Sequence, residues 1–574
     1  MSQINPPSHS SESADIGKQQ QAYAYFQQSL AYRDQGQLRP ALQGLRHALK
    51  LAPERRADIA QAMASILVQI APTQYQAELA EDLLICFSEP TIDHQHLATL
   101  AALQLLAKYD LVDLRYGESV DLSMLMNKRL MNELKNDGLL MAFLSQCINI
   151  NAPMEWLLIQ FRQYILLGYQ RDGVAFLQEQ QSLLVALATQ SFANQYIWPI
   201  QVDEAEQLLL LAGSLGNSES SEQTFLLLLL ATYQPLTDIS QWDVSTLDWS
   251  VFPEQCQQLI QRSVIDVMVE RQVAQALPSF SAVDDQISNA VRAQYESCPY
   301  PRWTIPPAGR MPALTQVLRQ LPRYVDPQNI GEPIQLLVAG CGTGYEPIEI
   351  SRMQSDLQVT AIDLSRNSLA YGLNKAQELA IDNVQFIQGD ILQVVQLNKH
   401  FDVVVSTGVL HHMADTLAGW QSLYNVTQTG GVMRISLYSE LARRRVVQGR
   451  EKIATMGLST SLVDMQRFRQ YLFTEAQGEL AELASSDDLY SLSGCRDLLF
   501  HEQEQRFNFH QIGEMAQQLG LKMIGLDWPS AAVHQQFRTM FPEPETMFDF
   551  AKLNEFEQRY PDAFLTMYQI WWQK

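Results

Sequence analysis

The chain has 574 residues, of which 47% are hydrophobic and 18% are charged. This composition is globular, and the length predicts two or three domains. Forty Lys and Arg residues against 63 Asp and Glu give a formal net charge of −23, which disfavours nucleic acid and anionic membrane surfaces as partners.

Cysteine usage and hydropathy predict the compartment. The six cysteines are scattered, without the spacing of a disulfide framework or a zinc site. The N-terminus lacks a signal-peptide pattern, and the longest leucine run, 225–230, is too short to span a bilayer. We expect a cytoplasmic protein that needs neither membrane nor nucleic acid.

The first half of the chain reads as helical. Residues 1–15 are Ser/Pro-rich and predicted to be a disordered tail, whereas 16–277 have apolar residues at helical spacing. We predict an all-α domain of tetratricopeptide-like (TPR-like) helical hairpins, because one helical pair fits that repeat. The matching residues are Tyr25, Ser29, Tyr32, Ala41, Leu45, Ala48 and Pro53. Two interpretations are open: a docking surface for a protein or peptide partner, and a helical support or dimerisation domain.

Residues 278–330 are predicted to be a linker, because the prolines of 298–303 forbid a continuous helix. Tyr295 and Tyr300 are candidates for a lid over a bound ligand, and ordinary packing residues are an equal alternative.

From 331 to 440 strands and helices alternate, which predicts a Rossmann-like α/β sheet. The expected strands are 336–339, 359–362, 384–387, 402–406 and 432–438. The first runs into Gly340-Cys341-Gly342-Thr343-Gly344, where glycines let the backbone approach a ligand closely. Tyr345 stands where a dinucleotide fingerprint needs its third glycine, so a nicotinamide cofactor fits poorly. Asp363 ends the second strand, where an acid can accept hydrogen bonds from ribose hydroxyls.

In motif content and order, residues 331–440 resemble the class I S-adenosylmethionine methyltransferases. The resemblance implies S-adenosylmethionine as cofactor, with the methionine and ribose part against the three glycines, ribose on Asp363, and adenine on Asp390 and Ile391. The full implied cofactor set is Gly340, Cys341, Gly342, Thr343, Gly344, Asp363, Leu364, Asp390, Ile391, Thr407, Tyr295 and Tyr300. Many members carry an acid two residues before the first glycine, where this chain has Val338.

A wider resemblance, covering most of the chain from Tyr295 onward together with the repeat-like front, is to bacterial tetratricopeptide-containing methyltransferases. It implies a methyltransferase whose acceptor is unassigned. The alternative is a helical-repeat protein that binds S-adenosylmethionine as a scaffold or sensor without turnover.

His411 and His412 follow the fourth strand, where the transferred methyl would lie, so either is a candidate general base. The alternative is packing against the cofactor and capping of the next helix. Arg443 and Arg444 are candidates to receive an acidic group on the substrate, although a solvated helix face is the commoner role of such a run.

Residues 441–510 are predicted to be a helical insertion that shapes an acceptor pocket. Residues 511–574 would complete the methyltransferase domain with a helix at 511–519 and a strand at 521–528, and the aromatic tail would pack back onto a domain. No metal site is predicted, because His501, Glu502, Glu504 and His510 lack recognised ligand spacing.

Overall fold

A computed structural model describes residues 9–118, 128–215, 220–239, 249, 252–283, 285–303, 312–327 and 331–574. The chain divides into two compact units. The first comprises Met1–Asn194, Ile200–Gln234 and Ile305–Gly309, and the second comprises Gln195–Pro199, Pro235–Thr304 and Arg310–Lys574.

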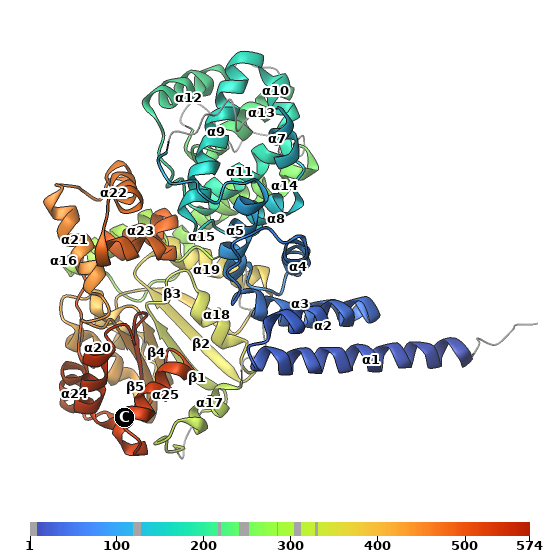
Figure 1. Cartoon of the computed structure of the whole chain (residues 1–574). Coiled ribbons are helices and arrows are strands. Elements are labelled where there is room, and N and C mark those ends of the chain that lie inside the picture. The colour runs from blue at the N-terminus through green and yellow to red at the C-terminus, as the bar shows by residue number, and fades with distance from the viewer. Residues whose placement is uncertain are drawn as a thin grey trace, which may run out of the picture. The chain divides into compact units, whose positions relative to one another are not determined.

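The first unit is helical (Figure 1). Its helices are α1 (His9–Asp34), α2 (Leu38–Leu51), α3 (Arg56–Leu67), α4 (Ala77–Phe87), α5 (Ala98–Lys108), α7 (Lys128–Leu134), α8 (Gly138–Gln146), α9 (Ala152–Asp172), α10 (Val174–Glu179), α11 (Gln181–Ala193), α12 (Val202–Ser214) and α13 (Ser220–Ala231). Helix α1 begins at His9, inside the predicted tail, while residues 1–8 lie outside the described part of the chain. Among the described helices, none is both long and apolar enough to cross a membrane.

Helices α1 and α2 pack closely through small side chains. Ser29, Ala41 and Ala48 are each at most 1% exposed. A Cβ added to Gly44 would lie 2.1 Å from Ser29 Oγ, so a larger residue there would displace this hydroxyl. These small residues are therefore buried in the helical unit, and at Gly44 helix α2 lies directly against Ser29 of α1.

The second unit is built on one seven-stranded sheet (Figure 1). Its strands are β1 (Ile334–Ala339), β2 (Leu357–Asp363), β3 (Val384–Gln388), β4 (Phe401–Thr407), β5 (Thr427–Leu437), β6 (Lys522–Asp527) and β7 (Tyr568–Gln573). Their order is β3-β2-β1-β4-β5-β7-β6. The neighbours from β3 to β5 are parallel, whereas β7 is antiparallel to both β5 and β6.

The helices of this unit include the two layers that cover the sheet. They are α14 (Gln257–Ile260), α15 (Asp266–Ala276), α16 (Gln286–Ser297), α17 (Leu314–Gln320), α18 (Tyr345–Ser351), α19 (Arg366–Glu378), α20 (Thr416–Val426), α21 (Arg444–Thr455), α22 (Leu462–Thr474), α23 (Leu492–Leu499), α24 (Phe509–Gln518), α25 (Ala531–Met540) and α26 (Phe550–Arg559).

Alternate residues of β1 belong to two separate cores, as expected for a strand with both faces buried. Leu337 lies in the core that includes residues of α20, α24, α25 and α26. Leu336 lies in the other core, with residues of α15, α17, α18 and α19. Both side chains are 0% exposed. Because all parallel strands end at one edge of this sandwich, the loops after them form a common rim.

The predicted boundary at 277 differs from the structural one, because the units divide near residue 235. Ala274 and Leu277 belong to a core of the sheet. The Arg366 guanidinium on α19 also donates to the carbonyls of both residues, at 3.1 and 2.8 Å. Helical spacing could not reveal this division, because α15 has the periodicity of the preceding helices and packs on a different core.

The aromatic tail forms strand β7, which was not expected. It inserts between β5 and β6, so Tyr568, Ile570, Trp571 and Trp572 are all buried. A strand buried on both faces shows no polar alternation, and the tail therefore lacked a period-two signal.

Candidate functional site

The loop between β1 and α18 carries three glycines in the left-handed region. Gly340, Gly342 and Gly344 have φ values of 79°, 52° and 82°. A Cβ on Gly344 would lie 2.8 Å from Gly372 Cα, so the loop packs directly on the backbone of α19. The loop is thus a rigid backbone cradle at the edge where the parallel strands end.

Asp363 stands beside this cradle at the end of β2. Its carboxylate accepts hydrogen bonds from the N–H of Gly342, at 2.9 Å, and from that of Ser365, at 2.8 Å. Burial raises the pKa of Asp363 to about 6. A carboxylate has about four lone-pair positions, so it can also accept from hydroxyl groups of a ligand.

Asp390 follows β3 and is 3% exposed. Its carboxylate accepts from Leu392 N–H at 2.9 Å, and its own N–H donates to Ser281 Oγ at 3.0 Å. Ile391 and Leu364 place apolar surface beside it. An acid next to apolar side chains suits a flat heterocycle with an amino group.

These residues line one cavity of about 510 Å³. Eleven predicted residues meet there: Tyr295, Tyr300, Gly340, Cys341, Gly342, Asp363, Leu364, Asp390, Ile391, Thr407 and His412. Thr343, Gly344, His411, Arg443 and Arg444 are not among the described residues that line it.

The segment after α16 is held against the glycine cradle. Trp303 Nε1 donates to the Thr343 carbonyl at 3.2 Å, and Thr343 Oγ1 donates to the carbonyl of Pro301. A Cβ on Gly342 would lie 2.8 Å from the Tyr300 carbonyl oxygen. The lid candidate Tyr300 therefore belongs to a segment that packs directly on the glycine cradle, whereas Tyr295 lies in the preceding helix α16.

Gly342→Ala should weaken ligand binding in this cavity by more than the backbone strain of a positive φ alone would cause. Gly457 offers a matched control, because its φ of 65° is similar and a Cβ there would meet open space. We expect calorimetric affinity for S-adenosylhomocysteine to fall about tenfold or more in Gly342→Ala and to be retained in Gly457→Ala. Equal affinities in the two variants would contradict the close packing of this segment on the loop.

The adjacent histidines His411 and His412 have different surroundings. His412 lines the cavity, whereas His411 is 0% exposed and its two ring nitrogens have no hydrogen-bond partner among the residues that the structure describes. The His411 ring packs on Tyr438, with 4.0 Å between ring centroids. His411 is thus placed for packing, and His412 remains the candidate base.

One residue, Gln503, fixes the protonation pattern of two site histidines. His412 Nδ1 lies 2.6 Å from the Gln503 carbonyl oxygen, so Nδ1 must carry the proton and Nε2 the lone pair. The Gln503 N–H donates to His501 Nδ1 at 3.1 Å, which leaves the proton of a neutral His501 on Nε2. Burial lowers the pKa of both imidazoles, so both are neutral at pH 7.

A hydrogen-bond chain starts from His501. Its Nε2–H lies 3.1 Å from the Tyr295 hydroxyl oxygen, and Tyr295 donates in turn to Asp497 Oδ1 at 2.5 Å. The sequence singled out Tyr295 and His501 but gave Asp497 no role, because nothing in local spacing links α16 to α23. Asp497 is 7% exposed and lines the cavity beside His412.

His412, Asp497 and His501 also offer ligand atoms within 4.8 Å of one another, as a metal site would. However, the rings of His412 and His501 are stacked, with centroids 3.7 Å apart and planes at 18°. A metal ion bound in the plane of one ring cannot lie in the plane of a ring stacked on it. The observed arrangement suits the hydrogen-bond chain better than a shared cation.

The two predicted substrate arginines lie elsewhere. Arg443 forms a 2.5 Å ion pair with Glu504, whose side chain is 0% exposed. Arg444 pairs with Asp562 at 2.6 Å and Glu479 at 3.3 Å on a partly exposed face. Both guanidinium groups thus already have carboxylate partners, and the solvated-face interpretation describes Arg444.

Glu346 is a cavity residue that sequence reasoning did not single out. Its carboxylate accepts from Thr407 Oγ1 at 3.0 Å and forms an ion pair with Arg434. It lies in the first turn of α18, next to the glycine cradle. Glu346 therefore puts an acid close to the loop in a chain that has Val338 in place of the usual one.

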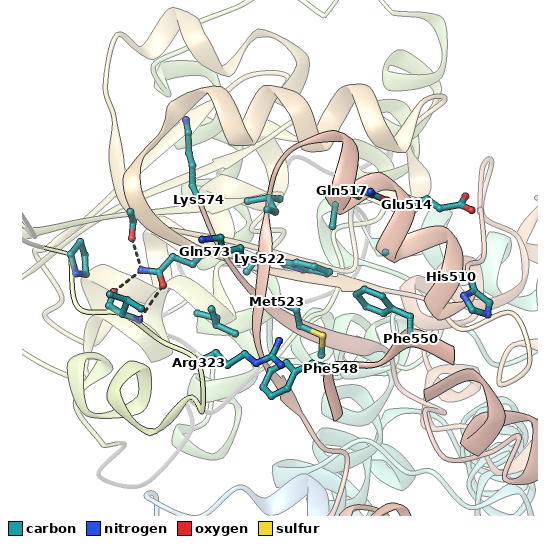
Figure 2. Close-up of a pocket in the computed structure, with 18 residues that line it drawn as sticks. Arg323, His510, Glu514, Gln517, Lys522, Met523, Phe548, Phe550, Gln573 and Lys574 are labelled. Carbon is teal, nitrogen blue, oxygen red and sulfur yellow. Dashed lines mark hydrogen bonds between the residues drawn. The ribbon is translucent and has the colours of Figure 1, made fainter. Parts of the chain in front are cut away.

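A second cavity of about 870 Å³ lies at the opposite edge of the sheet, near the start of β6 and the end of β7 (Figure 2). Phe548, Phe550 and Met523 give it apolar walls, and His510 lies at its side (Figure 2). Its described lining lacks the glycine cradle and the strand-end acids. It therefore supplies control positions for tests of the first cavity.

Part of this region is similar to a known protein family. Residues 332–485 match the family model described as a methyltransferase domain. An uncharacterized protein of Synechococcus is 27% identical over 273 residues, covering 43% of this chain and 61% of its own length. The malonyl-[acyl-carrier protein] O-methyltransferase of Serratia marcescens is 38% identical over 110 residues, covering 19% of this chain and 38% of its own length.

Among solved structures, PKMT2 from Rickettsia typhi in complex with AdoHcy is 17% identical. The alignment covers 44% of this chain and 52% of that chain, with a TM-score of 0.35. The chain thus spans less than two thirds of the length of these relatives. By this match, residues 332–485 resemble a methyltransferase domain.

Proposed function

We propose that this protein is an S-adenosylmethionine-dependent methyltransferase. The observation that carries the proposal is one cavity that joins the glycine cradle to Asp363 and Asp390, all of which lie in the region that matches a methyltransferase domain. When bound there, S-adenosylmethionine supplies an electrophilic methyl group on a sulfonium. The cradle suits its methionine part, Asp363 its ribose hydroxyls, and Asp390 with Ile391 its adenine.

Glu346 is proposed to receive the amino end of the cofactor. An ammonium group beside this carboxylate would share it with Arg434 and Thr407. His412 is proposed to accept a proton from the acceptor, since its Nε2 carries a lone pair and its ring is neutral at pH 7. The cavity walls exclude water and orient the acceptor, which is the main task in an in-line displacement.

The finer assignments are also proposals. We infer that the helical unit is tetratricopeptide-like and docks a protein or peptide partner; the close packing of α1 on α2 through Ser29, Ala41 and Ala48 supports the first part. A cytoplasmic location is supported by the six cysteines, all of them unpaired and buried.

The test is calorimetric titration of the full chain with S-adenosylhomocysteine, beside Asp390→Ala and the second-cavity variant His510→Ala. We expect binding by the wild type and by His510→Ala, with affinity about 10- to 100-fold weaker in Asp390→Ala, which loses a charge-assisted hydrogen bond. A wild type that does not bind would refute the proposed function.

A further inference from the structure

One end of the cavity is lined by Tyr295, Tyr300 and His412, and we take it as the place where the methyl acceptor binds. Its side chains offer several atoms that accept hydrogen bonds. Tyr295 donates its hydroxyl proton to Asp497, and Tyr300 donates its own to Asp488 Oδ1 at 2.9 Å. Both phenol protons are therefore used, so toward a ligand these oxygens can act only as acceptors; the Tyr295 oxygen already accepts from His501 Nε2–H and has one further lone pair. His412 adds a third acceptor, because the Gln503 carbonyl holds its proton on Nδ1. Such a wall binds a group that brings N–H or O–H donors.

The charge of the surrounding side chains indicates which kind of hydrogen-bond donor the ligand brings. The carboxylate of Asp497 lines the cavity and is accompanied by Asp488 behind Tyr300. Burial, together with the negative charge of Asp497, raises the pKa of Asp488 to about 6. Two neighbouring carboxylates in a poorly solvated place favour a cation between or beside them.

The described cations near this cavity already have partners. Arg434 pairs with Glu346, and Arg443 and Arg450 both pair with Glu504, the latter at 3.1 Å. A carboxylate or phosphate acceptor would therefore have to break an existing ion pair, part of which is buried, at a cost of several kcal/mol. A neutral alcohol would add no positive charge to that which Arg443 and Arg450 already place near Asp497.

We infer that the methyl acceptor is an amine that enters the site as an ammonium group held by Asp497 and by the hydroxyl oxygens of Tyr295 and Tyr300. This inference rests on the proposed methyltransferase function. His412 Nε2 takes one ammonium proton, which frees the nitrogen lone pair. The nitrogen then bonds the methyl carbon as the carbon–sulfur bond breaks, and the electron pair of that bond stays on sulfur.

The test uses the full chain saturated with S-adenosylhomocysteine. Three matched sets are titrated by calorimetry: butylammonium, benzylammonium and spermidine, each against an alcohol and a carboxylate of the same carbon skeleton. We expect at least one ammonium to bind about tenfold or more tightly than both of its matched compounds. Asp497→Asn should lose most of that preference, by about 10- to 100-fold, because it removes a hydrogen bond to a charged group.

Control variants distinguish a failure of the amine inference from a failure of the proposed methyltransferase function. Asp497→Asn should keep the wild-type affinity for S-adenosylhomocysteine, and Glu514→Gln in the second cavity should keep the ammonium preference. Tyr295→Phe is a second variant, which should weaken ammonium binding without removing the carboxylate. If S-adenosylhomocysteine binds but no ammonium outbinds its alcohol and carboxylate, the amine inference is overturned. If S-adenosylhomocysteine itself does not bind, the proposed function fails first.

Discussion

Asp363→Asn is expected to weaken S-adenosylhomocysteine binding by about 10- to 100-fold, because hydrogen bonds to charged groups contribute about 1.5–3 kcal/mol. The asparagine keeps one oxygen for the Gly342 or Ser365 N–H, so the cradle should survive. Thermal unfolding of the free variant checks that the domain remains folded.

The same carboxylate predicts a pH dependence. Burial raises the pKa of Asp363 to about 6, and the ionised form is the one that accepts hydrogen bonds from ribose hydroxyls. Affinity should be full well above pH 6 and should fall as the pH drops through about 6, by up to tenfold per pH unit. Asp363→Asn should lack this dependence, and a wild-type profile that is flat from pH 5 to 7.5 would contradict the assignment.

The ionisation of Asp363 affects the folding stability of the free protein in the opposite direction to ligand affinity. Because the pKa of Asp363 is higher in the folded than in the unfolded chain, its ionisation opposes folding. Its contribution in the free protein is therefore most favourable below pH 3.8 and is lost as the pH rises through about 6. A ligand that binds the ionised form offsets this loss, so S-adenosylhomocysteine should stabilise the chain more at pH 7 than at pH 5.

That the proposed cofactor residues lie together could be predicted from sequence, because the signals are local. A strand, a glycine loop and an acid at the next strand end follow one another over 334–363, and parallel strands carry such residues to one edge. The loop residues Gly340 and Gly342 and the acids Asp363 and Asp390 accordingly share a cavity.

The acceptor side could not be predicted in the same way, because it is assembled from distant segments. Tyr295 meets Asp497 across 202 residues of sequence, and His412 meets Gln503 across 91. No periodicity connects α16, 410–412 and α23. The arginine run was conspicuous in an acidic chain, but charge along the sequence does not reveal that Glu504 lies buried against Arg443.

His412→Phe is expected to lower methyl transfer by about 10²- to 10⁴-fold, the usual contribution of a positioned general base. The Gln503 carbonyl holds the ring proton of His412 on Nδ1, so Nε2 carries a lone pair that can accept a proton. Phenylalanine keeps a ring of similar shape but has no such lone pair. Affinity for S-adenosylhomocysteine should stay near that of the wild type. The measurement is release of S-adenosylhomocysteine with the best amine of the binding panel.

His411→Phe is the matched partner, since the two rings are adjacent and both are buried. In the described part of the chain the ring nitrogens of His411 have no hydrogen-bond partner, so phenylalanine removes buried polar atoms and keeps the packing on Tyr438. Turnover should be retained and stability unchanged or higher. Equal losses in both variants would mean that the pair acts through packing, whereas a loss confined to His412→Phe would assign proton transfer to the histidine that faces the cavity.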